Sequence, residues 1–132
     1  MEDSVFSKII KGEIPSHKIY EDEKTLAFLD IRPVQPGQVV VVSKLQVNFV
    51  WDLPAEDYAA LMSTVQKVGQ HLRESFPEKQ RIAVRIEGFD VNNHAHVVLI
   101  PSNNPAEFNA HPNMEAEPDH EALAKLAESL RF

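Results

Sequence analysis

The sequence predicts an α+β fold in which a mostly antiparallel sheet of about five strands is covered by one long helix, with a short helix at each end. Strand-like segments come before and after a single long helical pattern, so repeated strand–helix–strand units are not indicated. The 132 residues are 43% hydrophobic and contain no internal repeat, which fits a single domain over 1–132 with a core of its own.

The first 43 residues predict one helix and three strands. VFSKIIKG (5–12) places apolar residues at helical spacing and ends in Lys-Gly, a stop signal. Two strands near 17–21 and 25–30 follow, joined by a charged turn. RPVQPGQ is a loop because Pro and Gly interrupt it, and QVVVVS (38–43) is typical of a strand buried on both faces.

The remaining residues predict two helices and two strands. Residues 54–76 form the clearest helix, with an apolar stripe made of Tyr58, Leu61, Met62, Val65, Val68 and Leu72. An alternating strand spans 79–88, and a second strand spans 94–101. Residues 102–117 predict a loop rich in Asn, Pro and Glu, and 118–132 an amphipathic helix.

Composition excludes several classes of function. A formal net charge of -7 argues against general binding to nucleic-acid phosphates. The absence of cysteine excludes disulfides, thiolate metal sites and cysteine nucleophiles. The longest apolar run, VVVV at 39–42, is too short to cross a membrane, and the N-terminal residues have no apolar segment of a secretory signal. We therefore expect a cytoplasmic protein with no membrane partner.

Two histidines stand two positions apart in NNHAHVVLIP (92–101). On a strand, His94 and His96 project from one face, ~7 Å apart. The alternate residues Ala95, Val97 and Leu99 project from the other face, which we expect to face the core. Three interpretations remain open: surface or core histidines, a metal site, or nucleophilic catalysis by one imidazole that the other orients. A metal site needs a further ligand, for which Asp90, His111 and His120 are candidates.

The motifs, taken together, resemble the histidine triad (HIT) family. Several blocks occur in the order that the family has: KIIKGEIP, IYED (V-Y-E-D in the family pattern), LAFLDI followed by RP, PGQ, and the valine-rich strand. A long helix and a His-x-His strand that ends in Pro101 come after them. The resemblance runs from residue 5 to about 108, and leaves 109–132 as a C-terminal loop and helix. It implies a HIT-like fold, a purine nucleotide substrate and no required cofactor or metal.

The resemblance also implies catalytic roles. His96 falls on the family nucleophile and His94 on the first histidine of the triad, whose main-chain carbonyl orients the nucleophile. Val98 occupies the third histidine's position, and Gln38 replaces the histidine of the family P-G-H loop. Loss of that third imidazole predicts weakened activity, because general acid–base help is typically worth ~10²–10⁴-fold.

The same resemblance assigns substrate-binding residues. Asp30 would accept the ribose hydroxyls, with Ile31 beside it, and Gln38 would be a further substrate-binding residue. The apolar slot for the base would be formed by Phe28, Ile14, Phe6 and Ile9. In the short loop before the triad, Asn92 and Asn93 could supply amide donors to the phosphate.

Some family branches carry a Cys-x-x-Cys zinc site. Here those positions hold Ser4 and Ser7, and Gln46 replaces the histidine after the Pro-Lys pair, so we expect this site to be absent.

Three functions are therefore compared. The first is a HIT-type hydrolase or transferase that cleaves at the α-phosphate of a nucleoside phosphoramidate, an adenylated compound or a dinucleoside polyphosphate through a covalent His96 intermediate. The second is a nucleotide-binding relative with impaired catalysis, and the third a metal-binding protein that uses His94 and His96. The resemblance further implies a homodimer formed by the 54–76 helix and the 79–87 strand. Arg81 and Arg85 could face solvent or the phosphates.

Overall fold

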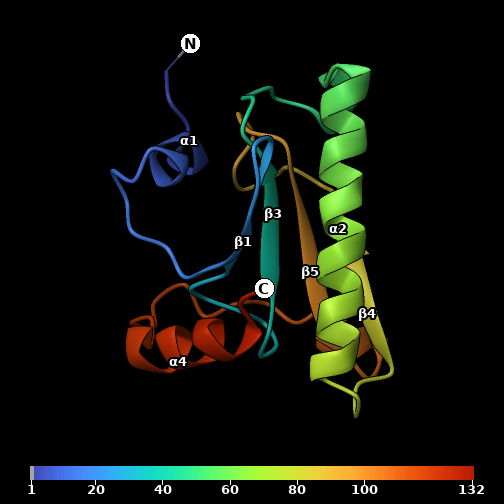
Figure 1. The fold of residues 1–132 in the computed structure, drawn as a ribbon. Helices are drawn as coiled ribbons and strands as arrows, with labels where there is room; N and C mark the ends of the chain where they lie inside the picture. Colours follow the sequence, from blue (N-terminus) through green and yellow to red (C-terminus); the bar gives the residue numbers. More distant parts are fainter. Residues whose placement is uncertain (1) are drawn as a thin grey trace.

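The computed structural model describes residues 2–132 and contains a five-stranded antiparallel sheet with helices on both faces (Figure 1). The strand order is β1-β2-β3-β5-β4, and each neighbouring pair is antiparallel. The strands are β1 (Lys18–Glu21), β2 (Thr25–Leu29), β3 (Val39–Ser43), β4 (Arg81–Arg85) and β5 (His96–Ser102). The predicted α+β fold is thus confirmed.

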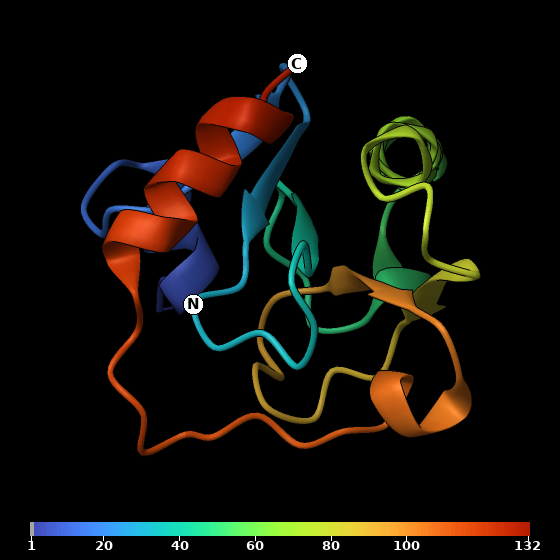
Figure 2. The same ribbon diagram turned by 90° about the horizontal axis from the view of Figure 1, so that it is seen from below.

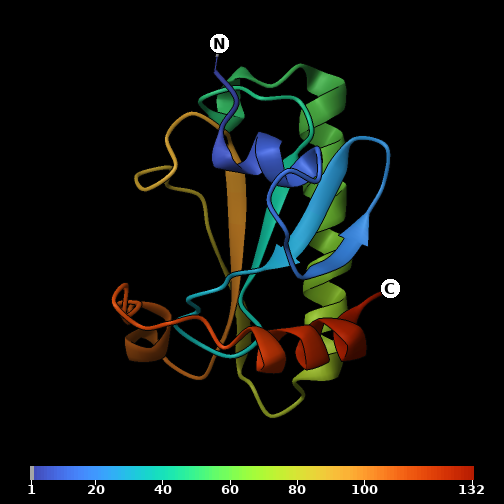
Figure 3. The same cartoon turned by 90° about the vertical axis from the view of Figure 1, so that its left-hand side faces the viewer.

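The helices divide between the two faces of the sheet. Helix α1 (Val5–Ile10) lies in front of the sheet in Figure 3, and the long helix α2 (Ala55–Ser75) lies behind it. Helix α4 (His120–Leu130) contacts β1, β2 and α2. The view from below shows it beside the blue N-terminal strands (Figure 2). A short α3 (Pro105–Phe108) and a 3-10 turn (Val50–Asp52) complete the set among the described residues.

Two apolar clusters fill the two sides of the sheet, and β3 contributes to both. Val39 and Val41 join the larger cluster beneath α2 and α4, whereas Val40 and Val42 join a smaller cluster beneath α1. The predicted burial of this strand on both faces is therefore confirmed. The smaller cluster defines the side of the sheet on which the candidate site is built.

The last strand begins later than predicted. His94 is not part of β5, which starts at His96, because the backbone N–H of Ala95 bonds to the carbonyl of Val47 in the loop after β3 (2.7 Å). The prediction of a loop over 102–117 was also wrong in part, since it contains α3. Asn104 caps that helix through its side chain and Pro105 begins it, a start signal within the polar segment. No helix within residues 2–132 has the length and apolar character needed to cross a membrane.

Candidate functional site

His96, the first residue of β5, carries an imidazole in a defined tautomer. Its Nδ1 lies 2.9 Å from the carbonyl oxygen of His94. A carbonyl only accepts hydrogen bonds, so Nδ1 holds the proton and the neutral ring keeps its lone pair on Nε2. Nε2 has no hydrogen-bond partner among residues 2–132. This ring therefore presents a free nucleophilic nitrogen.

His94 is fully buried and both of its ring nitrogens are bonded. Nε2 lies 2.6 Å from the carbonyl oxygen of Ser43, and Nδ1 lies 2.6 Å from the hydroxyl of Ser4. Burial lowers the pKa of His94, which favours the neutral ring. Phe6 meets both imidazoles edge-on, with ring centroids 5.7 Å from His94 and 5.0 Å from His96. The two histidines thus lie on the same side of the sheet, as predicted, although only His96 faces open space.

His96 lines a hollow of about 420 Å³ beneath α1, which we call the nucleotide hollow after the ligand that the sequence resemblance leads us to expect. The pairing of β3 with β5 explains why His96, Val98 and Val40 line the same wall. His96 is paired with Val42 and Val98 with Val40, so all four side chains project from one face of the sheet. The hollow brings together most residues predicted for the substrate: Phe6, Ile9, Ile14, Phe28, Asp30, Ile31 and Gln38.

Sequence reasoning missed part of this wall. Pro112 and Met114 also line the nucleotide hollow, since the segment between α3 and α4 runs along the side of the sheet away from α2 (Figure 2). A hydrogen bond from Arg32 Nε to the carbonyl oxygen of Ala116 (3.3 Å) ties this segment to the loop after β2. No helical or strand pattern marks these residues, so only their place in the fold reveals them.

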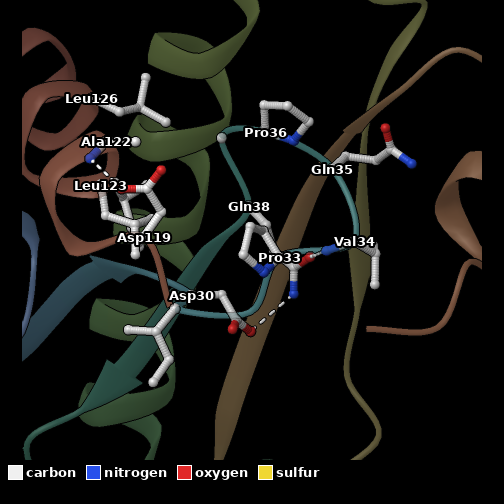
Figure 4. Close-up of a pocket in the computed structure, with 13 residues that line it drawn as sticks. Asp30, Pro33, Val34, Gln35, Pro36, Gln38, Asp119, Ala122, Leu123 and Leu126 are labelled. Atoms are coloured by element: carbon white, nitrogen blue, oxygen red, sulfur yellow. Dashed lines mark hydrogen bonds between the residues drawn. The ribbon is translucent and has the colours of Figure 1, made fainter. Parts of the chain in front are cut away.

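Asp30 stands at the end of β2 with its carboxylate held in place. Its two oxygens accept from the backbone N–H of Arg32 (2.9 Å) and from the side-chain amide of Gln38 (3.0 Å; Figure 4). The amide oxygen of Gln38 in turn accepts from the N–H of Val34 (2.8 Å). Gln38 is therefore a buried residue that positions Asp30 as well as a lining residue of the hollow.

The turn that carries Gln38 requires glycine before it. Gly37 has φ +86°, a conformation that other residues rarely adopt, and a Cβ there would lie 2.6 Å from ring atoms of Phe76 at the end of α2. The Pro-Gly pair thus lets the loop approach α2 closely enough to return Gln38 to Asp30.

Asn92 and Asn93 line a neighbouring hollow of about 360 Å³, and not the nucleotide hollow. His96 borders both, so the two hollows meet at its ring. The second hollow, which we call the outer hollow, also contains Phe49 and Trp51, whose exposed fractions are 63% and 72%. Sequence reasoning missed both aromatic residues because they lie in the irregular segment before α2.

Comparison with known proteins gives the family of this chain. The chain matches the family model of the HIT domain over residues 11–105. The chain belongs to the HIT family. It is 32% identical to adenosine 5'-monophosphoramidase HNT1 of Candida albicans, over 96% of this chain and 88% of that protein. The match to Protein hit of Bacillus subtilis is 40% identical but spans 57% of this chain and about half (52%) of that protein.

Solved HIT structures have the same fold. A Hit-like protein from Bartonella henselae superposes with a TM-score of 0.80 at 26% identity, covering 98% of this chain and 95% of that one. A Zn-bound histidine triad family protein from Mycobacterium smegmatis gives 0.75 at 28% identity, covering 97% and 92%.

A charged residue stands next to Val98, the residue that the resemblance aligns with the third histidine of the family. Val98 is paired with Arg85 across β4 and β5, and both line the nucleotide hollow. The guanidinium of Arg85 lies 4.5 Å above the ring of Phe108 and donates to that residue's carbonyl oxygen (3.0 Å). Arg85 therefore borders the hollow.

A metal site at the histidine pair is not supported. The two nitrogens of His94 are already engaged, and within residues 2–132 no three His, Asp or Glu side chains come together as a metal-binding group. Asp90 lines the nucleotide hollow, but His111 and His120 do not, and His120 is bonded to His17 (3.0 Å).

Proposed function

We propose that this HIT protein is a nucleotide hydrolase that cleaves at the α-phosphate of a nucleoside phosphoramidate, an adenylated compound or a dinucleoside polyphosphate. The carrying observation is His96, whose Nδ1 is fixed by the His94 carbonyl while Nε2 stands free at the nucleotide hollow. The name of the Candida albicans relative, an adenosine 5'-monophosphoramidase, supports this class of substrate.

The nucleoside would occupy the nucleotide hollow. A purine base would lie against the apolar wall that α1 and β2 contribute to this hollow, where Phe6 and Phe28 contact each other with ring centroids 5.7 Å apart. Asp30 is suited to the ribose hydroxyls because a half-buried carboxylate accepts strong hydrogen bonds. The Gln38 amide holds that carboxylate in place without adding a second negative charge.

The reaction would proceed in two displacements at phosphorus. The Nε2 lone pair of His96 forms a bond to the α-phosphorus while the bond to the leaving group breaks, and the Nδ1 proton shared with the His94 carbonyl stabilises the charged ring. Water then attacks the phosphorus, the His96 bond breaks and the nucleoside monophosphate is released. Val98 cannot deliver a proton, so the leaving group would take one from solvent.

Two further groups fit this scheme. Arg85, beside Val98, carries the positive charge that the non-bridging phosphate oxygens need. The outer hollow on the other side of His96 would receive the leaving group, and Asn92 and Asn93 offer amide donors there.

The second candidate is a nucleotide-binding HIT relative with little turnover. Its supporting observation is the apolar side chain of Val98 at the place where family enzymes have the third histidine. Binding needs the nucleotide hollow and Asp30, which are present, whereas efficient chemistry also needs a proton donor.

One experiment separates the two candidates. The purified protein is incubated with adenosine 5′-phosphoramidate and AMP release is followed, with His96→Ala alongside and AMP binding measured by titration. Release that disappears in His96→Ala supports the hydrolase. AMP binding without release in the unmodified protein supports the binding relative, and absence of both contradicts each of them.

A further inference from the structure

Three side chains from distant segments meet at the buried ring of His94. Ser4 and Ser7 come from the start of α1, and Gln46 from the loop after β3. The hydroxyl of Ser4 lies 2.6 Å from His94 Nδ1, and the hydroxyl of Ser7 lies 2.6 Å from Gln46 Oε1. Gln46 Oε1 also accepts from the backbone N–H of Ser4 (3.1 Å). We call these four residues the His94 cluster.

The direction of each hydrogen bond in the His94 cluster follows from donor chemistry. The carbonyl of Ser43 can only accept, so His94 Nε2 carries the ring proton and Nδ1 is an acceptor. Ser4 must therefore donate its hydroxyl proton to Nδ1, while its oxygen accepts from the backbone N–H of Ser7 (2.9 Å). Ser4 thus caps α1 and fixes the ring of His94 with the same oxygen.

Three members of the cluster, Ser4, Ser7 and Gln46, occupy positions that the family resemblance assigns to zinc ligands, yet the chemistry of the cluster does not fit zinc. Zinc sites in proteins use thiolate, imidazole or carboxylate, whereas Ser4, Ser7 and Gln46 offer neutral hydroxyls and an amide. His94 is the one usual zinc ligand among the four, and its Nδ1 is already bonded to Ser4. The Zn-bound relative from Mycobacterium smegmatis shows that the fold itself can accompany zinc.

We propose that the His94 cluster is a metal-free clamp that positions the nucleophile, with Ser4 and Gln46 as positioning residues. The connection is short. The clamp holds the His94 ring between Ser4 and Ser43, and the carbonyl of the same residue accepts the Nδ1 proton of His96 at 2.9 Å. Its effect on turnover rests on the proposed function, but its effect on the two rings does not.

The first test is Ser4→Ala, with Ser129→Ala, at an exposed position of α4, as the matched control. Proton–nitrogen NMR of the imidazoles reads the tautomers directly. Since the carbonyls of Ser43 and His94 still accept from the two rings, we expect Nε2–H for His94 and Nδ1–H for His96 in both proteins. Ser4→Ala should displace the Nδ1 resonance of His94 and, through the shifted His94 carbonyl, the Nδ1–H resonance of His96. With adenosine 5′-phosphoramidate, kcat should fall about tenfold, the change expected for one lost hydrogen bond, while KM changes little. An unchanged Nδ1–H resonance of His96 in a folded Ser4→Ala protein would overturn the clamp.

The second test does not depend on turnover or on the single variant folding well. The combined variant Ser4→Cys, Ser7→Cys and Gln46→His places two thiols and an imidazole around His94 Nδ1. After incubation with zinc and dialysis, it should retain a stoichiometric amount of the metal and the Nδ1–H tautomer of His96. The unmodified protein should retain none. Stoichiometric zinc in the unmodified protein, with the His94 resonances displaced, would contradict a metal-free clamp.

The two proposals fail in different ways. A displaced His96 Nδ1–H resonance in Ser4→Ala without AMP release from any form of the protein would leave the clamp and reject the hydrolase. AMP release together with an unchanged His96 resonance and an unchanged kcat in Ser4→Ala would leave the hydrolase and reject the clamp.

Discussion

At the scale of single residues, Val98 stands where the family resemblance leads us to expect the third histidine, and the charge next to it comes from a neighbouring side chain. Val98 supplies neither a proton nor a hydrogen bond, but its partner across the strands, Arg85, borders the same hollow. A guanidinium remains charged at all working pH values and donates to phosphate oxygens. One imidazole can both bind the phosphate and protonate the leaving group. We predict that these two tasks are divided here, with Arg85 binding the phosphate and solvent supplying the proton.

Two substitutions test that separation. Val98→His should raise kcat for adenosine 5′-phosphoramidate by up to ~10²-fold, because it restores a proton donor beside the phosphate. Arg85→Gln should mainly weaken AMP binding, because it removes charge and keeps an amide. Val98→Leu is the control for side-chain size. Equal kcat in Val98→His and Val98→Leu would contradict the assigned role of this position.

The sequence predicted the residues of the nucleotide hollow better than those of the neighbouring loop. Asp30 and Phe28 lie on or at the end of a regular strand, where period-two alternation and family motifs fix their direction. Asn92 and Asn93 precede β5 in irregular backbone, which pattern alone cannot orient. The sequence also could not predict that β5 begins after His94, because this depends on a hydrogen bond between Ala95 and the distant Val47.

At the scale of elements, a pair of histidines connects the start of β1 to the start of α4. Nε2 of His17 lies 3.0 Å from Nδ1 of His120, so one ring donates and the other accepts. The pKa of His17 is lowered from its ordinary 6.5, first by burial and then by His120. The pKa of His94 is lowered as well, mainly by burial. Both rings therefore resist protonation in the folded chain.

This predicts lower stability in mild acid. The unfolded chain takes up protons at His17 and His94 near pH 6.5, whereas the folded chain does so only at lower pH. Protons then bind preferentially to the unfolded chain, so the free energy of unfolding is highest above pH 6.5 and decreases below it. Urea unfolding between about pH 8 and about pH 5 measures this while most carboxylates stay ionised.

His17→Gln should flatten that pH dependence, since glutamine can still bond to His120 but does not titrate. His111→Gln, on the exposed segment between α3 and α4, is the control. The same slope in both variants would rule out a contribution from the His17–His120 pair.

Sequence patterns predicted the bounds of the long helix and of the valine-rich strand well. The apolar stripe predicted α2 to within a residue at each end, and the valine run predicted β3. The prediction for 79–88 was too long, because only residues 81–85 find ladder partners on β5. Helix α3 is too short for any periodicity to reveal, and its Asn-Pro start was the one available signal.

At the scale of the whole molecule, one edge of the sheet is covered by the C-terminal residues and the other edge is open within residues 2–132. The C-terminal residues cover β1, where the N–H of Phe132 donates to Ile19 (3.0 Å) and Arg131 Nε donates to Lys18 (3.3 Å). At the other edge, β4 pairs only with β5 among the described strands, and Val84 remains 45% exposed. An apolar edge strand favours pairing with another chain.

We propose that a second copy of this chain pairs along β4, as the family resemblance led us to expect. Val84→Lys should then shift the protein from dimer to monomer, because a charge on an edge strand opposes pairing. Light scattering coupled to gel filtration measures the mass, and circular dichroism checks that the fold is kept. Val84→Thr keeps the β-branched shape without charge and should remain dimeric. A monomeric unmodified protein at high micromolar concentration, or a dimeric Val84→Lys, would exclude this edge as the interface, and in the second case the dimer would have to use another surface, such as α2.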